Sequence, residues 1–214
     1  MSRVAARCSA YRHGSMRTLR EEILSDLRRF MTKSQDNLSA PDDLLHRVSA
    51  FCTPQILAQA LYRTAHYCFV RQWLLPAAIL ARVNSLVHKV NIPPQSCIGP
   101  GLHMPHPCGV TFCGSAGSEC TIYSLATAGA DTRHADGPIN LSPFLGNRVT
   151  LAAHEALMGP ITVGDDVKTA LFTFRMDFDV PSGVMVRSRA KRPTLHNQPG
   201  HFETFRRPSP EVDR

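Results

Sequence analysis

Hydrophobic residues recur at every sixth position in two stretches of the chain. These positions are Ile92, Ile98, Met104, Val110, Ala116, Ile122 and Ala128, then Leu145, Leu151, Leu157 and Val163, with Thr169 and Arg175 continuing the step as polar residues. A step of six is neither a helical nor a strand period. It is the step of a parallel β-helix, whose triangular coils each take three hexapeptides.

The two stretches lie 17 residues apart, which is not a multiple of six. An inserted loop must therefore leave the coil between them, from about residue 130 to residue 143, and this loop carries Arg133 and His134. A polar loop on a rigid scaffold predicts a functional site, because binding and catalytic residues concentrate in such loops.

The N-terminal third has helical punctuation and period. We predict a helix capped by Thr18 and Glu21, a short helix near Ser39, a helix from Thr53 and Pro54 to Trp73, and a fourth opened by Pro76. The predicted buried residues of the first helix are Ile23, Leu24, Leu27, Phe30 and Met31, and those of the fourth are Ile79, Leu80, Val83, Leu86 and Val87.

At Asn91 the composition changes from helix formers to Gly, Pro, Thr and β-branched residues. The sequence thus predicts an α+β chain in which an N-terminal helical cap precedes a left-handed parallel β-helix with one extended loop. The predicted divisions are a disordered leader over 1–15, with Met16 as an alternative start, a helical domain over 16–90, a β-helix over 91–190 and a flexible basic tail over 191–214.

Composition narrows the function classes. The formal charge of +7 would suit a nucleic acid, but most of the excess lies at the two ends and no nucleic-acid motif accompanies it, so we expect no nucleic-acid partner. Seven cysteines without a Cys-x-x-Cys pair favour reduced thiols and a cytoplasmic location. The most apolar stretch, residues 65–81, is too short and too interrupted for stable membrane insertion.

Three segments resemble the serine acetyltransferases and their shorter hexapeptide-repeat relatives. The run NIPPQSCIGPGLHMPHPCGV, residues 91–110, is similar to the family's I-x-P-x-A-x-I-G-x-G-L-x-x-P-H-P-x-G-V. The stretch LGNRVTLAAHEALMGPITVGDDV, residues 145–167, resembles the family's I-G-x-x-V-x-I-G-A-x-A-x-I-L-G-x-I-x-V-G-x-x-V, and DVPSGVMV stands where the family has D-V-P-P-x-S-V-V.

The resemblance implies transfer of an acetyl group from acetyl-CoA to a hydroxyl, by default that of L-serine. An alcohol needs a general base as it attacks a thioester, and histidine suits that role. In the family the base lies in an L-D-H or L-P-H turn, which assigns the role to His106. The Arg133-His134 pair matches the family's D-R-H-P, in which Arg binds the acceptor's carboxylate and His helps to orient it.

The family binds acetyl-CoA in a groove where two prisms meet. The matching positions are Gly129, Ala130, Ala153 and Leu171, and Lys191 or Arg192 stands where a basic residue of the last coil would meet a CoA phosphate. The resemblance also implies a homotrimer, which the helical caps could pair into a hexamer.

Four positions depart from the family pattern. Asn91 replaces the aspartate that orients the base, and an amide cannot stabilise an imidazolium with charge. Pro105 replaces the acceptor-binding aspartate of the larger family members. RSRAKRP replaces the small, apolar close of the last coil, and Asp213-Arg214 replaces the terminal isoleucine that docks into cysteine synthase, so we expect no complex with that enzyme.

Two other functions stay open at this point. A degenerate, non-catalytic trimeric scaffold or regulatory partner is favoured by Asn91 and the altered last coils, and opposed by His106, Arg133 and His134. A γ-class carbonic anhydrase would need histidine ligands with a different spacing from that of His103 and His106, so we expect no metal.

Overall fold

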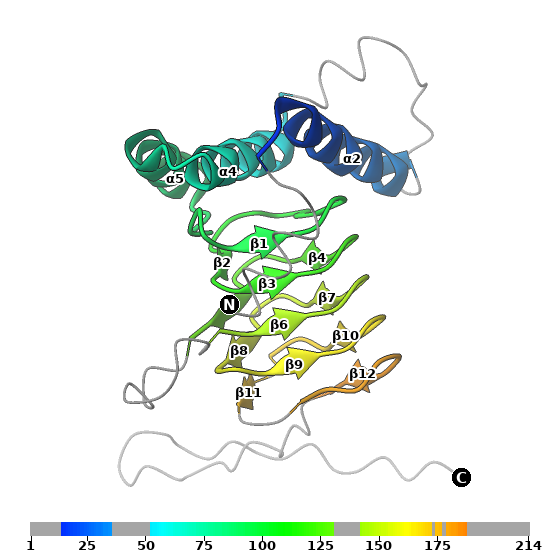
Figure 1. The fold of residues 1–214 in the computed structure, drawn as a ribbon. Coiled ribbons are helices and arrows are strands. Elements are labelled where there is room, and N and C mark those ends of the chain that lie inside the picture. The colour runs from blue at the N-terminus through cyan, green and yellow to red at the C-terminus, as the bar shows by residue number, and fades with distance from the viewer. Residues whose placement is uncertain (1–13, 36–51, 131–141, 173, 177–178, 188–214) are drawn as a thin grey trace, which may run out of the picture.

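The computed structural model describes residues 14–35, 52–130, 142–172, 174–176 and 179–187, the backbone alone for 174–176 (Figure 1). Helices α2 (Met16–Gln35), α4 (Pro54–Val70) and α5 (Leu74–His88) lie across one end of a stack of short strands. The helix predicted near Ser39, residues 1–13 of the predicted leader, residues 131–141 of the predicted loop and the tail over 191–214 lie outside the described residues.

The strands form a three-sided prism (Figure 1). They are β1 (Cys97–Ile98), β2 (Thr111–Phe112), β3 (Ser115–Ala116), β4 (Thr121–Ile122), β5 (Thr127–Gly129), β6 (Phe144–Leu145), β7 (Thr150–Leu151), β8 (Ala156–Met158), β9 (Thr162–Val163), β10 (Lys168–Thr169), β11 (Phe174–Met176) and β12 (Met185–Val186). All pair in parallel with the strand one coil away: β1, β3, β6 and β9 make the first face, β4, β7, β10 and β12 the second, and β2, β5, β8 and β11 the third.

The register confirms the predicted β-helix. Paired residues such as Cys97 and Ser115 lie 18 positions apart, three hexapeptides. Across the inserted loop the spacing grows to 29, from Thr121 to Thr150, because the loop adds eleven residues to one coil. The predicted ladder residues with described side chains are all buried, from Ile98 at 0% exposure to Thr169 at 7%.

The first coil departs from the regular six-residue step, and the departure is not visible in the sequence pattern because a longer step is followed by a shorter one. The second face is bridged through His103 and Thr121, whereas the third face pairs Thr111 with Thr127. The chain therefore takes eight residues from His103 to Thr111 rather than six, and then only four to Ser115. Phe112, not Val110, is the inward residue that pairs with Ala128, although Val110 is also buried.

Close stacking of the coils depends on glycine at one position of the first face. Gly99, Gly117, Gly146 and Gly164 follow one another there from coil to coil. A Cβ on Gly146 would lie 2.6 Å from the backbone of Gly164, which is closer than side-chain carbons approach. Because the contact is with backbone, it cannot be relieved by moving a side chain.

The first coil would leave a row of unpaired backbone groups, and the helices bind several of them. The Tyr62 hydroxyl donates to the Ser96 carbonyl at 2.9 Å, and Arg29 donates to the Gly101 carbonyl at 2.9 Å. Arg63 donates to the carbonyls of Ile98 and Gly99. An exposed strand edge invites pairing with other chains, so the cap also closes this end of the prism.

Arg63 is held by carboxylates of α2. Its guanidinium makes a two-pronged contact with Asp26, at 2.9 and 3.1 Å, and Glu22 lies 3.8 Å away. Asp26 also accepts from the Leu102 N–H at 2.7 Å. Burial alone would lower the pKa of Arg63, but the carboxylates of Asp26 and Glu22 outweigh it and raise that pKa, so the group stays charged.

These contacts correct the predicted face of α2. Leu19, Glu22 and Asp26 are its buried residues, whereas the predicted stripe from Ile23 to Met31 is only half-buried. The predicted cap is also one turn too late: the Thr18 N–H donates to the Ser15 Oγ at 3.0 Å, and Glu21 pairs with Arg17.

The predicted buried side of α5 is wrong. Ile79, Leu86 and Val87 are 53%, 71% and 65% exposed, and the buried residues are Ala77 and Asn84. The Asn84 Nδ2 donates to the Ala58 carbonyl at 3.0 Å, and Ala77 is small, so α5 packs on α4 through its short side chains and leaves its long apolar ones outside.

We predict that Asp26→Ala destabilises the fold by about 3–5 kcal/mol, because it leaves a buried guanidinium without its carboxylate. Urea unfolding followed by circular dichroism measures this. Glu21→Ala, which removes an exposed ion pair of the same helix, should leave the midpoint unchanged. Equal unfolding midpoints for Asp26→Ala and the unmodified chain would contradict the role given to this pair.

Candidate functional site

His106 lies in the corner that the two extra residues enlarge, where the second face turns into the third. Three hydrogen bonds fix this corner: Gln55 of α4 donates to the Pro105 carbonyl at 2.9 Å, the Gly109 N–H to the Lys89 carbonyl at 3.0 Å, and the Leu125 N–H to the Cys108 carbonyl at 3.1 Å. His106 is exposed between Pro105 and Pro107. The imidazole is thus presented to solvent from a corner whose backbone is held on both sides.

Asn91 begins the third face next to this corner. Its N–H donates to the Val110 carbonyl at 2.8 Å, and its carbonyl accepts from the Phe112 N–H at 3.0 Å. Its side chain is exposed, and within the described residues it makes no hydrogen bond with His106. The expected pairing of the Asn91 amide with the base therefore stays a prediction.

The corner of His106 continues down the prism as an edge that we call the His106 edge, formed by residues 105–109, 124–125, 153–154 and 171–172. Hydrogen bonds and ring contacts join its coils: the His154 N–H donates to the Ser124 carbonyl at 3.2 Å, and the His154 ring stacks on Phe172 at 5.0 Å. Leu125, Leu171 and Phe172 are exposed at 46%, 58% and 68%. The edge is therefore an apolar strip that leads away from His106.

The predicted acetyl-CoA positions divide between two edges. Ala153 and Leu171 lie on the His106 edge, half-buried and exposed respectively. Gly129 and Ala130 lie at the other end of the third face, where the inserted loop leaves the coil. Arg133, His134, Lys191 and Arg192 are outside the described residues.

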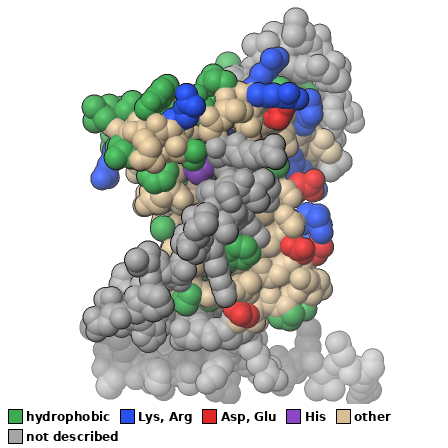
Figure 2. Space-filling view, viewed as in Figure 1, with side chains coloured by type: hydrophobic (Ala, Val, Ile, Leu, Met, Phe, Trp, Pro, Cys, Tyr) green, Lys and Arg blue, Asp and Glu red, His purple; other side chains and the backbone are tan. Residues whose placement is uncertain are grey.

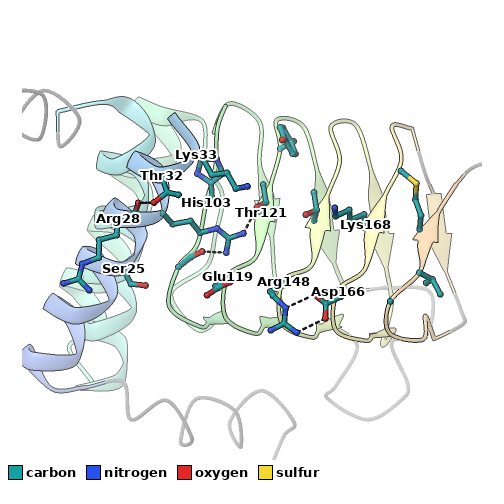
Figure 3. Close-up of a pocket in the computed structure, with 17 residues that line it drawn as sticks. Ser25, Arg28, Thr32, Lys33, His103, Glu119, Thr121, Arg148, Asp166 and Lys168 are labelled. Carbon is teal, nitrogen blue, oxygen red and sulfur yellow. Dashed lines mark hydrogen bonds and ion pairs between the residues drawn. The ribbon is translucent and has the colours of Figure 1, made fainter. Parts of the chain in front are cut away.

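Sequence reasoning missed a second concentration of polar groups. Along the edge where the first face turns into the second, Glu119, Arg148 and Asp166 occupy equivalent positions, and we call this the Arg148 edge. Arg148 donates to both oxygens of Asp166 at 2.7 Å. A cavity of about 1110 Å³ lies between this edge, the second face and α2 (Figure 3). The spacing of 18, extended by eleven across the loop, is the signal that links these residues.

His103 forms part of this cavity's wall. It is 7% exposed, lies 6.4 Å from the ring of Phe30, and its Nδ1 has no hydrogen-bond partner within the described chain. Burial lowers the pKa of His103 to about 4, and the nearby charges of Arg29, Lys33 and His106 add to the effect. His103 is therefore neutral at physiological pH.

None of the described helices is long and apolar enough to span a membrane. Among the described residues there is also no group of three or more His, Cys, Asp or Glu side chains placed to hold a metal ion.

A helical cap followed by a three-sided prism of hexapeptide coils defines the hexapeptide-repeat acyltransferases with a left-handed β-helix. No protein-family model matches the chain. The serine acetyltransferase of Helicobacter pylori is 33% identical over 141 residues, which cover 64% of this chain and 80% of the relative. That of Mycobacterium tuberculosis is 29% identical over 143 residues, 59% of its length. The chain therefore belongs to the serine acetyltransferase family.

Solved structures of this family share the fold. Serine acetyltransferase isoform 3 of Entamoeba histolytica, in complex with cysteine, superposes with a TM-score of 0.69 at 20% identity, over 91% of this chain and 67% of that one. The Neisseria gonorrhoeae enzyme gives a TM-score of 0.70 at 20% identity, over 85% and 68% of the two chains. A serine acetyltransferase in complex with CoA gives 0.67 at 19% identity, over 82% and 69%.

We predict that His103 makes folding stability depend on pH below neutrality. The unfolded state binds a proton at an ordinary histidine pKa near 6.5, whereas the folded state resists it down to about pH 4, so stability is full above pH 6.5 and falls between 6.5 and 4. In His103→Gln, the free energy of unfolding measured with urea should no longer contain the part of the fall between pH 6.5 and 4 that comes from His103. That part corresponds to the uptake of at most one proton on unfolding. Superimposable pH profiles for the two proteins would refute it.

Proposed function

We propose that the chain transfers an acetyl group from acetyl-CoA to the hydroxyl of a small acceptor, by default L-serine, with His106 as the general base. The observation that carries the proposal is the position of His106. It stands exposed on an enlarged corner clamped by Gln55, Lys89 and Leu125, at the head of an apolar strip, in a chain of the serine acetyltransferase family.

The chemistry follows from what an exposed, held imidazole can do. A ring nitrogen of neutral His106 accepts the acceptor's hydroxyl proton while the oxygen attacks the thioester carbonyl. The C–S bond then breaks, the acetyl group stays on the oxygen, and the proton returns from the imidazolium to the departing thiolate. The clamped corner contributes by holding the ring, since a base acts only within hydrogen-bond reach.

Acceptor recognition belongs to the inserted loop. Arg133 would bind a carboxylate through its fork of N–H donors, and His134 would orient the acceptor or stabilise the tetrahedral oxyanion. Related enzymes have been solved in complex with serine and with cysteine, which are both amino acids with a carboxylate. This supports an amino-acid acceptor here.

The acyl donor would lie along the His106 edge. The exposed apolar surface of Leu171 and Phe172 and the small side chain of Ala153 suit the pantetheine arm, with Arg192 of the basic tail near a phosphate. Gly129 and Ala130 lie at the opposite edge of the third face, so a single groove lined by all four positions requires two copies of the chain. That geometry supports a homotrimer with sites between subunits.

The helical cap supports further assembly. Helix α5 exposes Leu74, Leu75, Ile79, Leu86 and Val87, and Figure 2 shows hydrophobic side chains gathered over the cap. A patch of this kind marks an association surface. We propose that paired caps join two trimers into a hexamer.

The alternative is a non-catalytic trimeric scaffold. One specific observation favours it: the Asn91 amide makes no hydrogen bond with His106 in the described structure, and it cannot stabilise an imidazolium with charge. Acetyl transfer and scaffolding predict opposite results for the experiment below.

We predict that His106→Ala lowers the rate of CoA release from acetyl-CoA with L-serine by about 10²-fold or more, because it removes the base. Thiol release is followed with a panel of hydroxyl acceptors. His88→Ala on α5 is the matched control and should retain the full rate. Absence of release with every acceptor, and no difference between the proteins, would establish the scaffold instead.

Asn91→Asp should raise kcat above that of the unmodified chain, because a carboxylate would stabilise the imidazolium that forms during transfer. The pH profile of kcat/KM should move together with kcat. An unchanged kcat and an unchanged profile would show that Asn91 is not the partner of His106.

We predict that Leu75→Glu combined with Leu86→Glu halves the mass of the assembly from six chains to three, because each introduced charge would be buried between caps. Light scattering after size exclusion measures the mass, with 23.6 kDa per chain. Arg20→Glu, an exposed change on α2, is the control. A six-chain mass for the double variant would contradict pairing through α5.

A further inference from the structure

The cavity between α2 and the second face collects positive charge. Its cationic side chains come from three places: Arg28, Arg29 and Lys33 from α2, Lys168 from β10, and Arg148 from the Arg148 edge. Among the lining residues that the structure describes there are two carboxylates, Glu119 and Asp166. In Figure 3, Lys168 lies on the second face, Arg148 lies beside Asp166 at its edge, and Arg28 extends from α2 away from the prism. Figure 2 shows blue side chains over α2 beside the prism.

The two carboxylates neutralise only part of this charge. Asp166 is engaged by Arg148 through both oxygens. Arg29 is fixed by the Gly101 carbonyl and by the Thr121 hydroxyl at 3.1 Å, with Glu119 nearby. Within the described residues neither Arg28 nor Lys168 has an ion pair. Arg28 lines the cavity from the cap, and Lys168 lines it from the fourth coil of the prism.

His103 gives the site a buried polar wall. Its side chain is more than nine-tenths buried, and its Nδ1 has no hydrogen-bond partner among the described residues, which is a costly state for a buried polar atom. The nearby positive charges of Arg29 and Lys33 lower the pKa of His103 and so disfavour its protonation. An anion in the cavity would offset the repulsion between the two charged groups, Arg29 and Lys33, beside which His103 stays neutral.

We propose that this cavity binds a small phosphate-bearing anion. Guanidinium and ammonium groups are the preferred partners of phosphate, and the hydroxyls of Ser25 on α2 and of Thr121 and Thr150 on the second face add neutral donors around the cavity. The volume of about 1110 Å³ admits a nucleotide-sized ligand. The site is distinct from the proposed acyl-transfer site, because the described lining residues include neither His106 nor any other residue of the His106 edge.

Such a ligand would tie the cap to the prism. Arg28 belongs to α2 and Lys168 to β10, three coils beyond the one that the cap touches through Arg63. Binding to the folded state alone raises its stability by RT ln(1 + L/Kd), where L is the free ligand concentration. The site thus gives a phosphate-bearing molecule a means to stabilise the junction on which the base corner rests.

The test is titration calorimetry of the full chain with pyrophosphate and, separately, with adenosine 3′,5′-bisphosphate, at constant ionic strength. We expect saturable binding of at least one of them and a rise in melting temperature. Arg28→Gln combined with Lys168→Gln should weaken binding at least tenfold. Arg71→Gln combined with Arg82→Gln, an equal loss of charge outside the cavity, should leave the affinity unchanged.

Binding of either probe supports the site where the Arg28 and Lys168 variant weakens it; tighter binding of the bisphosphate then identifies a nucleotide ligand, and equal or tighter binding of pyrophosphate a free phosphate compound. Binding that this variant leaves unchanged would place the probe elsewhere, as in the acetyl-CoA groove, and would overturn the proposal. No saturable binding of either, or equal weakening in the Arg71 and Arg82 control, would overturn it. His106→Ala should keep the pyrophosphate affinity, so the result is independent of whether the chain transfers acetyl groups.

Discussion

The buried contact between Asp26 and Arg63 joins the helical cap to the β-helix. It links α2 to α4, and through the carbonyls of Ile98 and Gly99 and the N–H of Leu102 it links both helices to the first coil. Ionic pairs in a protein interior gain little net stability unless their remaining donors and acceptors are satisfied. Here the guanidinium reaches a carboxylate and two carbonyls, so the pair also fixes how the cap sits on the prism and closes the end of the β-helix.

The position of the corner that carries His106 depends on this junction between the helices and the first coil. Gln55 lies two helical turns before Arg63 on α4 and donates to the Pro105 carbonyl, so the helix that seals the first coil also holds the residue beside His106. The two extra residues between His103 and Thr111 let the corner stand out from the coil without disturbing the strands on either side. A rigid cap and one enlarged corner thus place an imidazole at the head of the apolar His106 edge, which is the arrangement that acyl transfer needs.

The six-residue step predicted the β-helix because each hexapeptide of a coil buries one residue, so every sixth position of the sequence must be compatible with burial. The helical faces could not be predicted in this way. Apolar periodicity assumes that buried means hydrophobic, but α2 turns Glu22 and Asp26 inward toward an arginine 37 positions beyond Asp26, and α5 packs through Ala77 and Asn84. The shift from Val110 to Phe112 was hidden because an eight-residue step is cancelled by a four-residue one. Of the candidate site, the sequence predicted His106, Ala153 and Leu171, which lie on one edge. The cavity around His103 could not be predicted, because it depends on how α2 lies beside the second face, and this long-range packing leaves no periodic pattern in the sequence.

The most direct test of the account is a single-turnover reaction with the protein in excess over acetyl-CoA that carries a labelled acetyl carbon. L-serine or another hydroxyl acceptor is present during the reaction, which is then quenched and analysed by mass spectrometry. The account predicts the label on the hydroxyl oxygen of the acceptor, at a rate that collapses in His106→Ala. Label that stays in acetyl-CoA with every acceptor, or transfer that proceeds equally in His106→Ala, would contradict it.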